Sequence, residues 1–165
     1  MTPLDEVLEC LRLRDDCLFH PASCFPKIPT GLQLPADLTE FYRRYSEALL
    51  FCRRDMKLKL QDSRCHVLPP NQFVQIGKAI LNEETTAVQA SWFSLADVQD
   101  GNYFAIDLAP SRLGRCYDCF HESFEPADCK IIALSFTELL NRFAEAGDDC
   151  WWLAEGFQGY GYGNS

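Results

Sequence analysis

Two cysteines and a histidine stand close together in the second half of the sequence, as Cys116, Cys119 and His121, and Cys129 follows nearby. Paired thiolates and an imidazole at such spacing can complete a tetrahedral zinc site or form a redox centre. The residues around them, however, alternate as in a β-strand, where side chains three positions apart point to opposite faces. We therefore expect Cys116 and Cys119 to be inert strand cysteines, and we expect neither a metal nor a cofactor.

The sequence also lacks the motifs of several other common catalytic sites. There is no phosphate loop, no dinucleotide-binding glycine pattern and no His-Glu-x-x-His zinc motif. The three histidines are the natural bases near neutral pH, and none stands in a recognisable nucleophile motif. The sequence therefore predicts a binding protein and not an enzyme.

Carboxylates collect in the second part of the chain. Residues 1–65 hold ten Lys/Arg and ten Asp/Glu, whereas residues 66–165 hold five Lys/Arg and fourteen Asp/Glu, so the net charge of −9 arises there. Such a field attracts a basic protein partner and repels nucleic acid. The alternative is that this charge serves solubility alone.

Acidic residues at the turns and strand ends of this part are the candidate contacts for a partner, because loops on a rigid scaffold commonly carry recognition. The alternative is a solvated acidic face. A tryptophan pair after the last predicted helix could anchor a partner, although such a pair is more often a lid on the core. The candidate contacts are Asp100, Asp118, Glu122, Glu125, Asp128, Trp151 and Trp152.

The helices that must support these residues are indicated by apolar residues at helical spacing. A first helix is expected over residues 3–14 behind Thr2 as its cap, and a second helix is expected to start near Pro35. A short third helix is expected over residues 73–80. The last helix should begin with a capping box between Ser135 and Glu138 and end at Gly147.

Strands are indicated where the hydrophobic period changes to two. Residues 49–52 and 56–60 predict a hairpin, and three later segments predict an antiparallel meander over residues 92–95, 103–108 and 115–120. Residues 20–35 hold several prolines and are expected to be irregular. The expected fold class is α+β, with helices packed on a mostly antiparallel sheet. Its core should contain Leu38, Phe41, Tyr45, Trp92, Phe104, Ile106, Phe136, Leu140 and Phe143.

The composition places the chain among ordinary globular proteins. Its 165 residues, 47% apolar and 24% charged, suit one domain over residues 1–155, followed by a Gly/Tyr-rich tail over residues 156–165. That composition is typical of a flexible tail, although its aromatic residues could dock on the body. Neither a signal peptide nor a membrane span is evident, so we expect a cytoplasmic protein with reduced cysteines and no membrane partner.

Three blocks of the sequence resemble the SUKH superfamily, which includes Smi/Knr-type regulators. Residues 34–45 resemble the Leu-Pro opening of a family helix, and residues 92–97 leading into 100–108 resemble a strand meander. Residues 114–122 resemble a further strand, and residues 132–140 resemble the Ser-Phe-capped helix that follows it. Their order and spacing carry the resemblance over residues 34–143. Two departures are Ser46-Glu47-Ala48, where the family usually has Asn-Gly-Gly, and Phe120, where an acid often precedes the His-Glu pair.

The resemblance implies a SUKH-like single domain that binds a protein partner. In bacterial members the partner is typically a toxin, often a nuclease, so the expected function is that of an immunity protein against a toxin domain that could be basic. Two alternatives are a regulatory scaffold of the cell-wall-regulator type and a small zinc or thiol enzyme that uses Cys116, Cys119 and His121. Neither the oligomeric state nor the toxin follows from the sequence.

Overall fold

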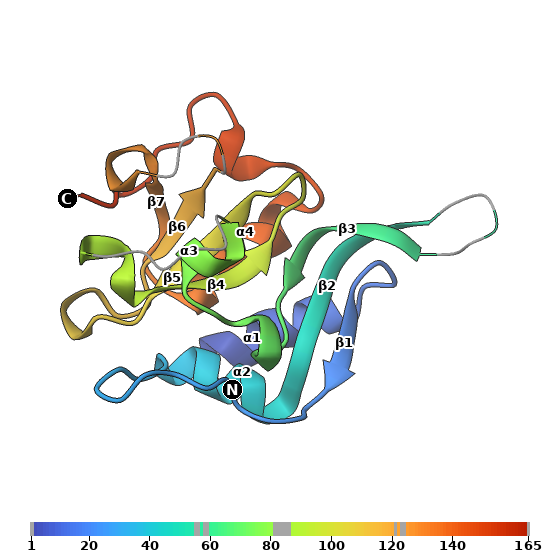
Figure 1. The fold of residues 1–165 in the computed structure, drawn as a ribbon. Coiled ribbons are helices and arrows are strands. Elements are labelled where there is room, and N and C mark those ends of the chain that lie inside the picture. Colours follow the sequence, from blue (N-terminus) through green and yellow to red (C-terminus); the bar gives the residue numbers. More distant parts are fainter. Residues whose placement is uncertain are drawn as a thin grey trace.

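The computed structural model describes residues 2–54, 57, 60–80, 87–120, 122 and 125–164. Within these residues seven strands form one sheet in chain order, and each strand is antiparallel to the next (Figure 1). The strands are β1 (Leu18–Pro21), β2 (Tyr45–Arg54), β3 (Leu60–Val67), β4 (Trp92–Asp97), β5 (Tyr103–Asp107), β6 (Cys116–Cys119) and β7 (Lys130–Ala133). The α-helices are α1 (Pro3–Arg12), α2 (Ala36–Arg44), α3 (Ile76–Ile80) and α4 (Phe136–Ala146). The α+β class with an antiparallel sheet is confirmed.

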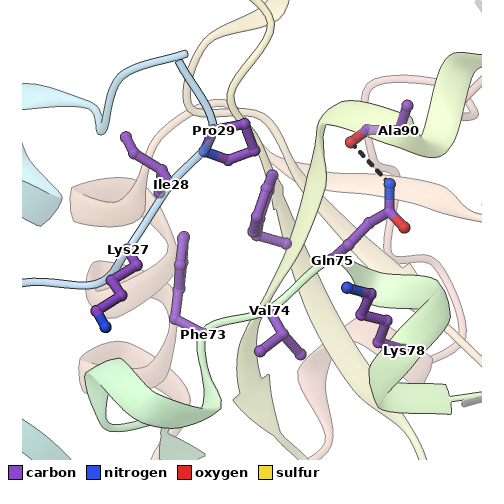
Figure 2. A pocket seen from close by; sticks show the side chains of 9 residues that line it. Lys27, Ile28, Pro29, Phe73, Val74, Gln75, Lys78 and Ala90 are labelled. Atoms are coloured by element: carbon purple, nitrogen blue, oxygen red, sulfur yellow. Dashed lines mark hydrogen bonds between the residues drawn. The ribbon is translucent and has the colours of Figure 1, made fainter. Parts of the chain in front are cut away.

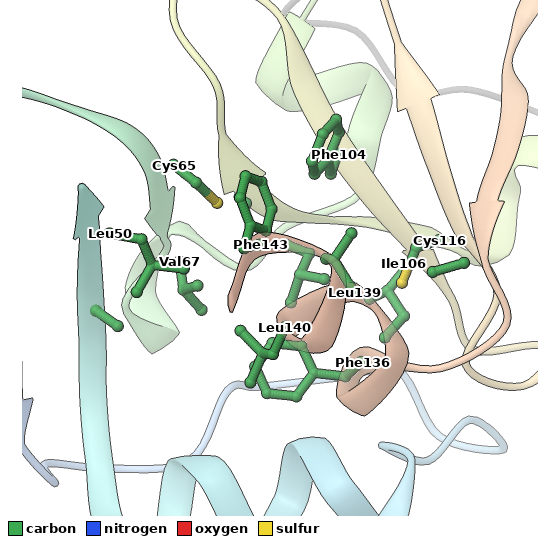
Figure 3. Close-up of a cluster of buried hydrophobic side chains, with 14 of the residues drawn as sticks. Leu50, Cys65, Val67, Phe104, Ile106, Cys116, Phe136, Leu139, Leu140 and Phe143 are labelled. Carbon is green, nitrogen blue, oxygen red and sulfur yellow. The ribbon is translucent and has the colours of Figure 1, made fainter. Parts of the chain in front are cut away.

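Three helices, α1, α2 and α4, pack together on one face of the sheet, and the main core lies between them and the strands. Figure 3 shows Phe136, Leu140 and Phe143 of α4 in this core beside strand residues such as Phe104. The rings of Phe41 on α2 and Phe136 on α4 meet edge to face at 5.3 Å. The predicted core is confirmed with one exception: Tyr45 is only half-buried, because the chain turns there from helix to extended strand.

A smaller apolar cluster lies on the opposite face of the sheet. Trp92 stacks on Tyr117 with ring centroids 3.8 Å apart, and Ile76 of α3 packs beside them. The C-terminal segment closes this face: Ile131 donates to the Gly161 carbonyl, and Gly163 donates to the Cys129 carbonyl, each at 2.8 Å. Residues 160–163 therefore lie along the outer edge of β7.

The helix ends show how local residues fix the elements. Thr2 and Asp5 form a capping box at the start of α1. The box predicted for α4 forms only in part: Ser135 accepts from the Glu138 N–H at 3.0 Å, but the Glu138 carboxylate accepts from the Leu134 N–H instead of that of Ser135. Gly147 has a φ of 69° at the end of α4, as expected of a C-terminal glycine.

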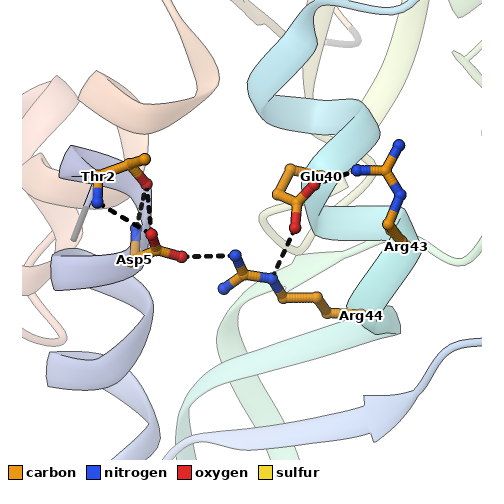
Figure 4. Close-up of polar contacts among 5 residues, drawn as sticks. All are labelled: Thr2, Asp5, Glu40, Arg43 and Arg44. Atoms are coloured by element: carbon orange, nitrogen blue, oxygen red, sulfur yellow. Dashed lines mark hydrogen bonds and ion pairs between the residues drawn. The ribbon is translucent and has the colours of Figure 1, made fainter.

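Ion pairs on the surface join the first two helices (Figure 4). Arg44 of α2 contacts Asp5 of α1 and Glu40 of its own helix, and Arg43 also pairs with Glu40. Hydrogen bonds from Thr2, followed by the contact with Arg44, lower the pKa of Asp5 to about 2. Because these pairs lie at the surface, solvent screens their attraction, and the helices are held mainly by their buried faces.

Several predicted boundaries differ from the structure. The first helix ends at Arg12, two short strands, β1 and β7, were not predicted, and β1 takes the first residues of the segment expected to be irregular. The hairpin exists, but β2 continues through the predicted turn to Arg54, and β3 starts at Leu60 and runs to Val67. Most of the predicted 56–60 strand lies outside the described residues. In the part of the chain that is described, no helix is long and apolar enough to cross a membrane.

Candidate functional site

The turn between β4 and β5, residues 98–102, separates two neighbouring hollows. We call them the outer hollow, of about 520 Å³, and the inner hollow, of about 390 Å³. Gln99 and Asp100 line both hollows, so the two are continuous around the turn. We refer to the hollows and the turn together as the acidic site.

The turn has an uncommon backbone. Gln99, Asp100 and Gly101 have φ values of 79°, 58° and 78°, a left-handed conformation that costs a non-glycine residue on the order of 1 kcal/mol. Hydrogen bonds hold it in place: the Gln99 N–H donates to the Asp97 carboxylate at 2.8 Å, and Val98 donates to the Asn102 carbonyl at 3.0 Å. The Gln99 amide also donates to the Ser63 carbonyl of β3. The Asp100 carboxylate is therefore presented at a fixed, exposed position.

The outer hollow carries three carboxylates. Asp62 of β3, Asp97 of β4 and Asp100 line it, with the ring of Tyr103 beside them. Burial, followed by the nearby Asp97 charge, raises the pKa of Tyr103, so this phenol remains a neutral hydrogen-bonding group. The hollow presents negative charge beside an amphipathic aromatic ring.

Next to these carboxylates, His66 joins a chain of contacts across β3, β2 and β1. Its Nε2 lies 2.7 Å from Oε2 of Glu47, and His20 Nδ1 lies 3.7 Å from Oε1 of the same carboxylate. Glu47 is thus shared by two imidazoles. This arrangement ties the wall of the outer hollow to the edge of the sheet.

The inner hollow combines charge with apolar surface. Asp100 and Asp118 line it together with Trp152, Phe120 and Leu153. Phe120 and Leu153 are large apolar residues with 40% and 68% of their surface exposed. Carboxylates beside exposed apolar groups suit a partner side chain with an apolar stem and a cationic head, such as arginine or lysine.

Asp118 is half-buried, and the pKa of its carboxyl group is shifted from the usual value. Its desolvation on β6 raises its pKa to about 6, although the neighbouring Lys130 acts in the opposite direction. An approaching cation would favour the charged form of this carboxylate. Arg64 also lines the inner hollow, and its guanidinium is engaged by the Asp148 carbonyl, which ties β3 to the chain after α4.

The structure brings together three of the seven predicted contacts, since Asp100, Asp118 and Trp152 line one hollow. Glu122, Glu125 and Asp128 are exposed in the connection between β6 and β7. The Trp151 ring is 9% exposed and packs edge to face on Phe143 at 5.4 Å. Both tryptophans belong to the main core, so they cover it as a core-closing pair would. Trp152 also lines the inner hollow.

Three residues of the acidic site, Asp62, His66 and Asp97, were not predicted as contacts. They meet because His66 pairs with Asp97 across β3 and β4, while the Gln99 amide binds Ser63 further along β3. This proximity depends on the register of strands that are far apart in sequence. In the sequence, Asp97 could have been recognised as a candidate contact, because it is an acidic residue directly before the turn.

The cysteines lie as strand alternation predicts. Cys116 belongs to the main core, whereas Cys119 belongs to the cluster on the other face with Cys129. Burial raises the pKa of both the Cys116 and Cys119 thiols, so neither is an activated thiolate. His121 lies outside the described residues, and among the residues that are described no three metal-ligating side chains cluster.

Comparison with known proteins gives two findings. A sequence profile of the SMI1 / KNR4 family (SUKH-1) matches residues 29–142. The immunity protein YokJ of Bacillus subtilis (strain 168) is 27% identical over 161 residues, which cover 96% of this chain and 93% of that protein. No solved structure matches the chain significantly.

Proposed function

The chain belongs to the SMI1 / KNR4 family (SUKH-1), and on that premise we propose that it is an immunity protein, which binds and neutralises a cognate toxin domain. The observation that carries the proposal is the similarity to the immunity protein YokJ along nearly the whole length of both chains. A match of that extent concerns the complete fold and not a shared segment.

The acidic site supports a basic partner. Asp62, Asp97, Asp100 and Asp118 line hollows next to exposed apolar residues, on a chain whose net charge is −9. Such a field speeds the encounter with a basic protein, and the apolar surface adds affinity once contact is made. A nuclease toxin fits this description, because a protein that binds nucleic acid carries a basic surface.

The proposed mode of action is occlusion without catalysis. The thiols that could serve as nucleophiles at Cys116 and Cys119 are buried and have raised pKa values. The acidic site itself offers shape, charge and a preformed turn, which are the properties that a binding surface needs. The alternative scaffold role would use the same surface without neutralising a toxin.

We further propose a cytoplasmic location and the division into a domain of residues 1–155 and a C-terminal segment of residues 156–165. The nine cysteines are free thiols, which suits a reducing compartment. Within residues 156–164, which the structure describes, the C-terminal segment adds pairing to β7 but contains no helix or strand of the sheet.

Co-expression tests the proposed function. A toxin domain encoded beside this gene is expressed in a susceptible host with and without the chain, and growth is measured. The proposal predicts growth only when the chain is present, together with a stable complex on size-exclusion chromatography. Continued toxicity with a soluble, folded chain and no complex would contradict it.

A further inference from the structure

A lysine and an aspartate face each other on two strands beside the acidic site. Asp118 of β6 and Lys130 of β7 are directly opposite in the antiparallel register, so their side chains project from the same face of the sheet. Opposite charges in this position usually attract each other. In the described part of the chain, however, Lys130 acts on Asp118 through its charge alone and donates no hydrogen bond to it. Another contact must therefore hold the cation.

The contact that holds Lys130 is the ring of Phe157 in the C-terminal segment. The Lys130 Nζ lies 5.6 Å from the ring centroid, within the distance of about 6 Å over which an aromatic ring attracts a cation. The stem of the lysine runs beside Gly159, where a Cβ atom would lie only 3.0 Å from Lys130 Cγ and 3.2 Å from its Cδ. The segment therefore contacts both the head and the stem of this side chain.

Phe157 itself is fixed by its surroundings. Its ring meets that of Trp151 edge to face at 5.3 Å, and its N–H donates to the Ala154 carbonyl at 3.1 Å. The guanidinium carbon of Arg142 on α4 lies 5.3 Å from the centroid of the same ring, and this arginine pairs with Glu138 at 3.1 Å. The half-buried ring is therefore a fixed platform for a cation, supported from α4 and from the chain that follows it.

The two possible contacts of Lys130 are similar in strength, so the position of the ring decides between them. A surface ion pair and a surface cation–π contact are each weak. The ring is already in place, whereas a pair with Asp118 would have to order the long lysine side chain without support from the segment. As a result the Asp118 carboxylate faces the inner hollow beside Asp100, and Arg64, which lines the same hollow, is engaged by the Asp148 carbonyl.

We propose that Phe157 is a positioning residue for the acidic site: its ring holds the Lys130 ammonium aside and keeps the Asp118 carboxylate available to a cation of the partner. Without the ring the ammonium would swing toward Asp118 and cancel one of the charges that attract the partner. The C-terminal segment thereby contributes to recognition through Lys130. The use of Asp118 by a toxin rests on the proposed function, whereas the contact between Phe157 and Lys130 does not.

The protonation of Asp118 in the free protein tests this role without a toxin. NMR titration of its carboxyl carbon is compared in the wild type, in Phe157→Leu, which keeps an apolar side chain without the ring, and in Phe157→Tyr, which keeps the ring. We expect Phe157→Leu to lower the pKa of Asp118 from about 6 to about 5 or below, because a closer cation favours the charged carboxylate. Phe157→Tyr should retain the wild-type pKa. In the Lys130→Gln background, Phe157→Leu should leave the pKa of Asp118 unchanged.

Two changes in the loop before α2 serve as matched controls. Phe25→Leu removes an aromatic ring that is 49% exposed, and Lys27→Gln neutralises a lysine that lines the hollow of Figure 2. The described lining residues of that hollow line neither hollow of the acidic site. Both controls should therefore leave the pKa of Asp118 as in the wild type. Thermal melting ensures that each variant is folded.

Three results would overturn the proposal. The first is an unchanged pKa of Asp118 in Phe157→Leu, and the second is an equal fall of that pKa with and without Lys130. The third can be measured in the wild type alone, where the ring current of Phe157 should shift the methylene protons of Lys130 upfield. The absence of this shift would show that the ring does not hold the lysine.

The toxin domain supplies a separate test. We expect Phe157→Leu to slow its association about 2- to 5-fold at low salt, and we expect no such slowing in the Lys130→Gln background. Unchanged association together with a lowered pKa of Asp118 would overturn the role of Phe157 in recognition. A chain that neutralises no toxin would refute the proposed function and leave the result for Asp118 and Lys130 in place.

Discussion

At the scale of single residues, Asp107 shows how a buried charge can organise a neighbourhood. Its carboxylate is fully buried and accepts from Ser91 Oγ at 2.6 Å, Tyr117 Oη at 2.7 Å, Arg112 Nε at 2.8 Å and the Ala109 N–H at 3.0 Å. All four donors therefore bond to the carboxylate of Asp107. The network joins β5 and β6 to the connection between them and to Ser91, which lies directly before β4.

Replacing Asp107 by alanine should therefore destabilise the protein strongly. The change leaves the Arg112 guanidinium and the Tyr117 hydroxyl without their shared acceptor, and we expect a loss of about 3–5 kcal/mol in the free energy of unfolding. Urea denaturation measures it. The exposed Asp100→Asn variant is the control and should change stability by less than about 0.5 kcal/mol; a similarly small effect of Asp107→Ala would refute the role of the network.

Asp118 makes a prediction about pH. Its pKa is raised to about 6 in the folded protein, well above the value of about 3.9 of an unfolded chain, so the folded state binds the extra proton. The free energy of unfolding of the wild-type protein therefore increases as the pH falls from 7 through 6, whereas an Asp118→Asn variant lacks this contribution. Urea denaturation at pH 7 and pH 5 should show that the unfolding free energy of the wild type rises, relative to that of the variant, at the lower pH. A difference in unfolding free energy between the two proteins that is equal at both pH values would show that burial does not perturb Asp118.

At the scale of elements, the helices and the central strands followed from the sequence because their apolar residues repeat over several turns or pairs. Two strands were missed: β1 ends at Pro21, where a proline-rich segment begins, and β7 reads Lys-Ile-Ile-Ala, which shows no alternation of polar and apolar residues. The start of β2 was missed because it begins at Tyr45 directly after α2 with no turn residue to mark the change. The acidic site was predictable only where its residues are local in sequence. Asp100 and Asp118 were expected at strand ends, whereas Asp62 and His66 reach the site through the pairing of β3 with β4.

The pairing of the C-terminal segment with β7 depends on two glycines. A Cβ atom at Gly163 would lie 2.3 Å from the Trp92 ring, and one at Gly159 would lie 2.3 Å from the Ile131 carbonyl oxygen. We expect Gly163→Val to release the segment and expose the Ile131 amide, which bonds to Gly161 in the wild type. Hydrogen exchange followed by mass spectrometry should show faster exchange over residues 129–133.

The control for this prediction is Asn164→Ala, which changes the neighbouring exposed residue without adding a clash. It should leave exchange over residues 129–133 as in the wild type. If Gly163→Val also keeps its protection, the segment is held by contacts other than those at Gly163.

At the scale of the whole molecule, negative charge gathers on one surface. The acidic site is lined by four aspartates from β3, β4, β6 and the turn between β4 and β5. The sequence indicated the overall negative charge and its concentration after residue 65, but the meeting of these four aspartates around two hollows depends on the tertiary fold. We therefore assign toxin recognition to the acidic site.

The association rate with the toxin domain shows whether recognition depends on the acidic site. Asp100→Asn/Asp118→Asn is compared with Glu6→Gln/Glu9→Gln, which neutralises two exposed charges on α1, by stopped-flow at low and high salt. We expect the acidic-site variant to associate about 3- to 10-fold more slowly at low salt and the difference largely to disappear at high salt, while the α1 variant stays near the wild type. Equal association rates for the two variants at both salt concentrations would contradict recognition through the acidic site.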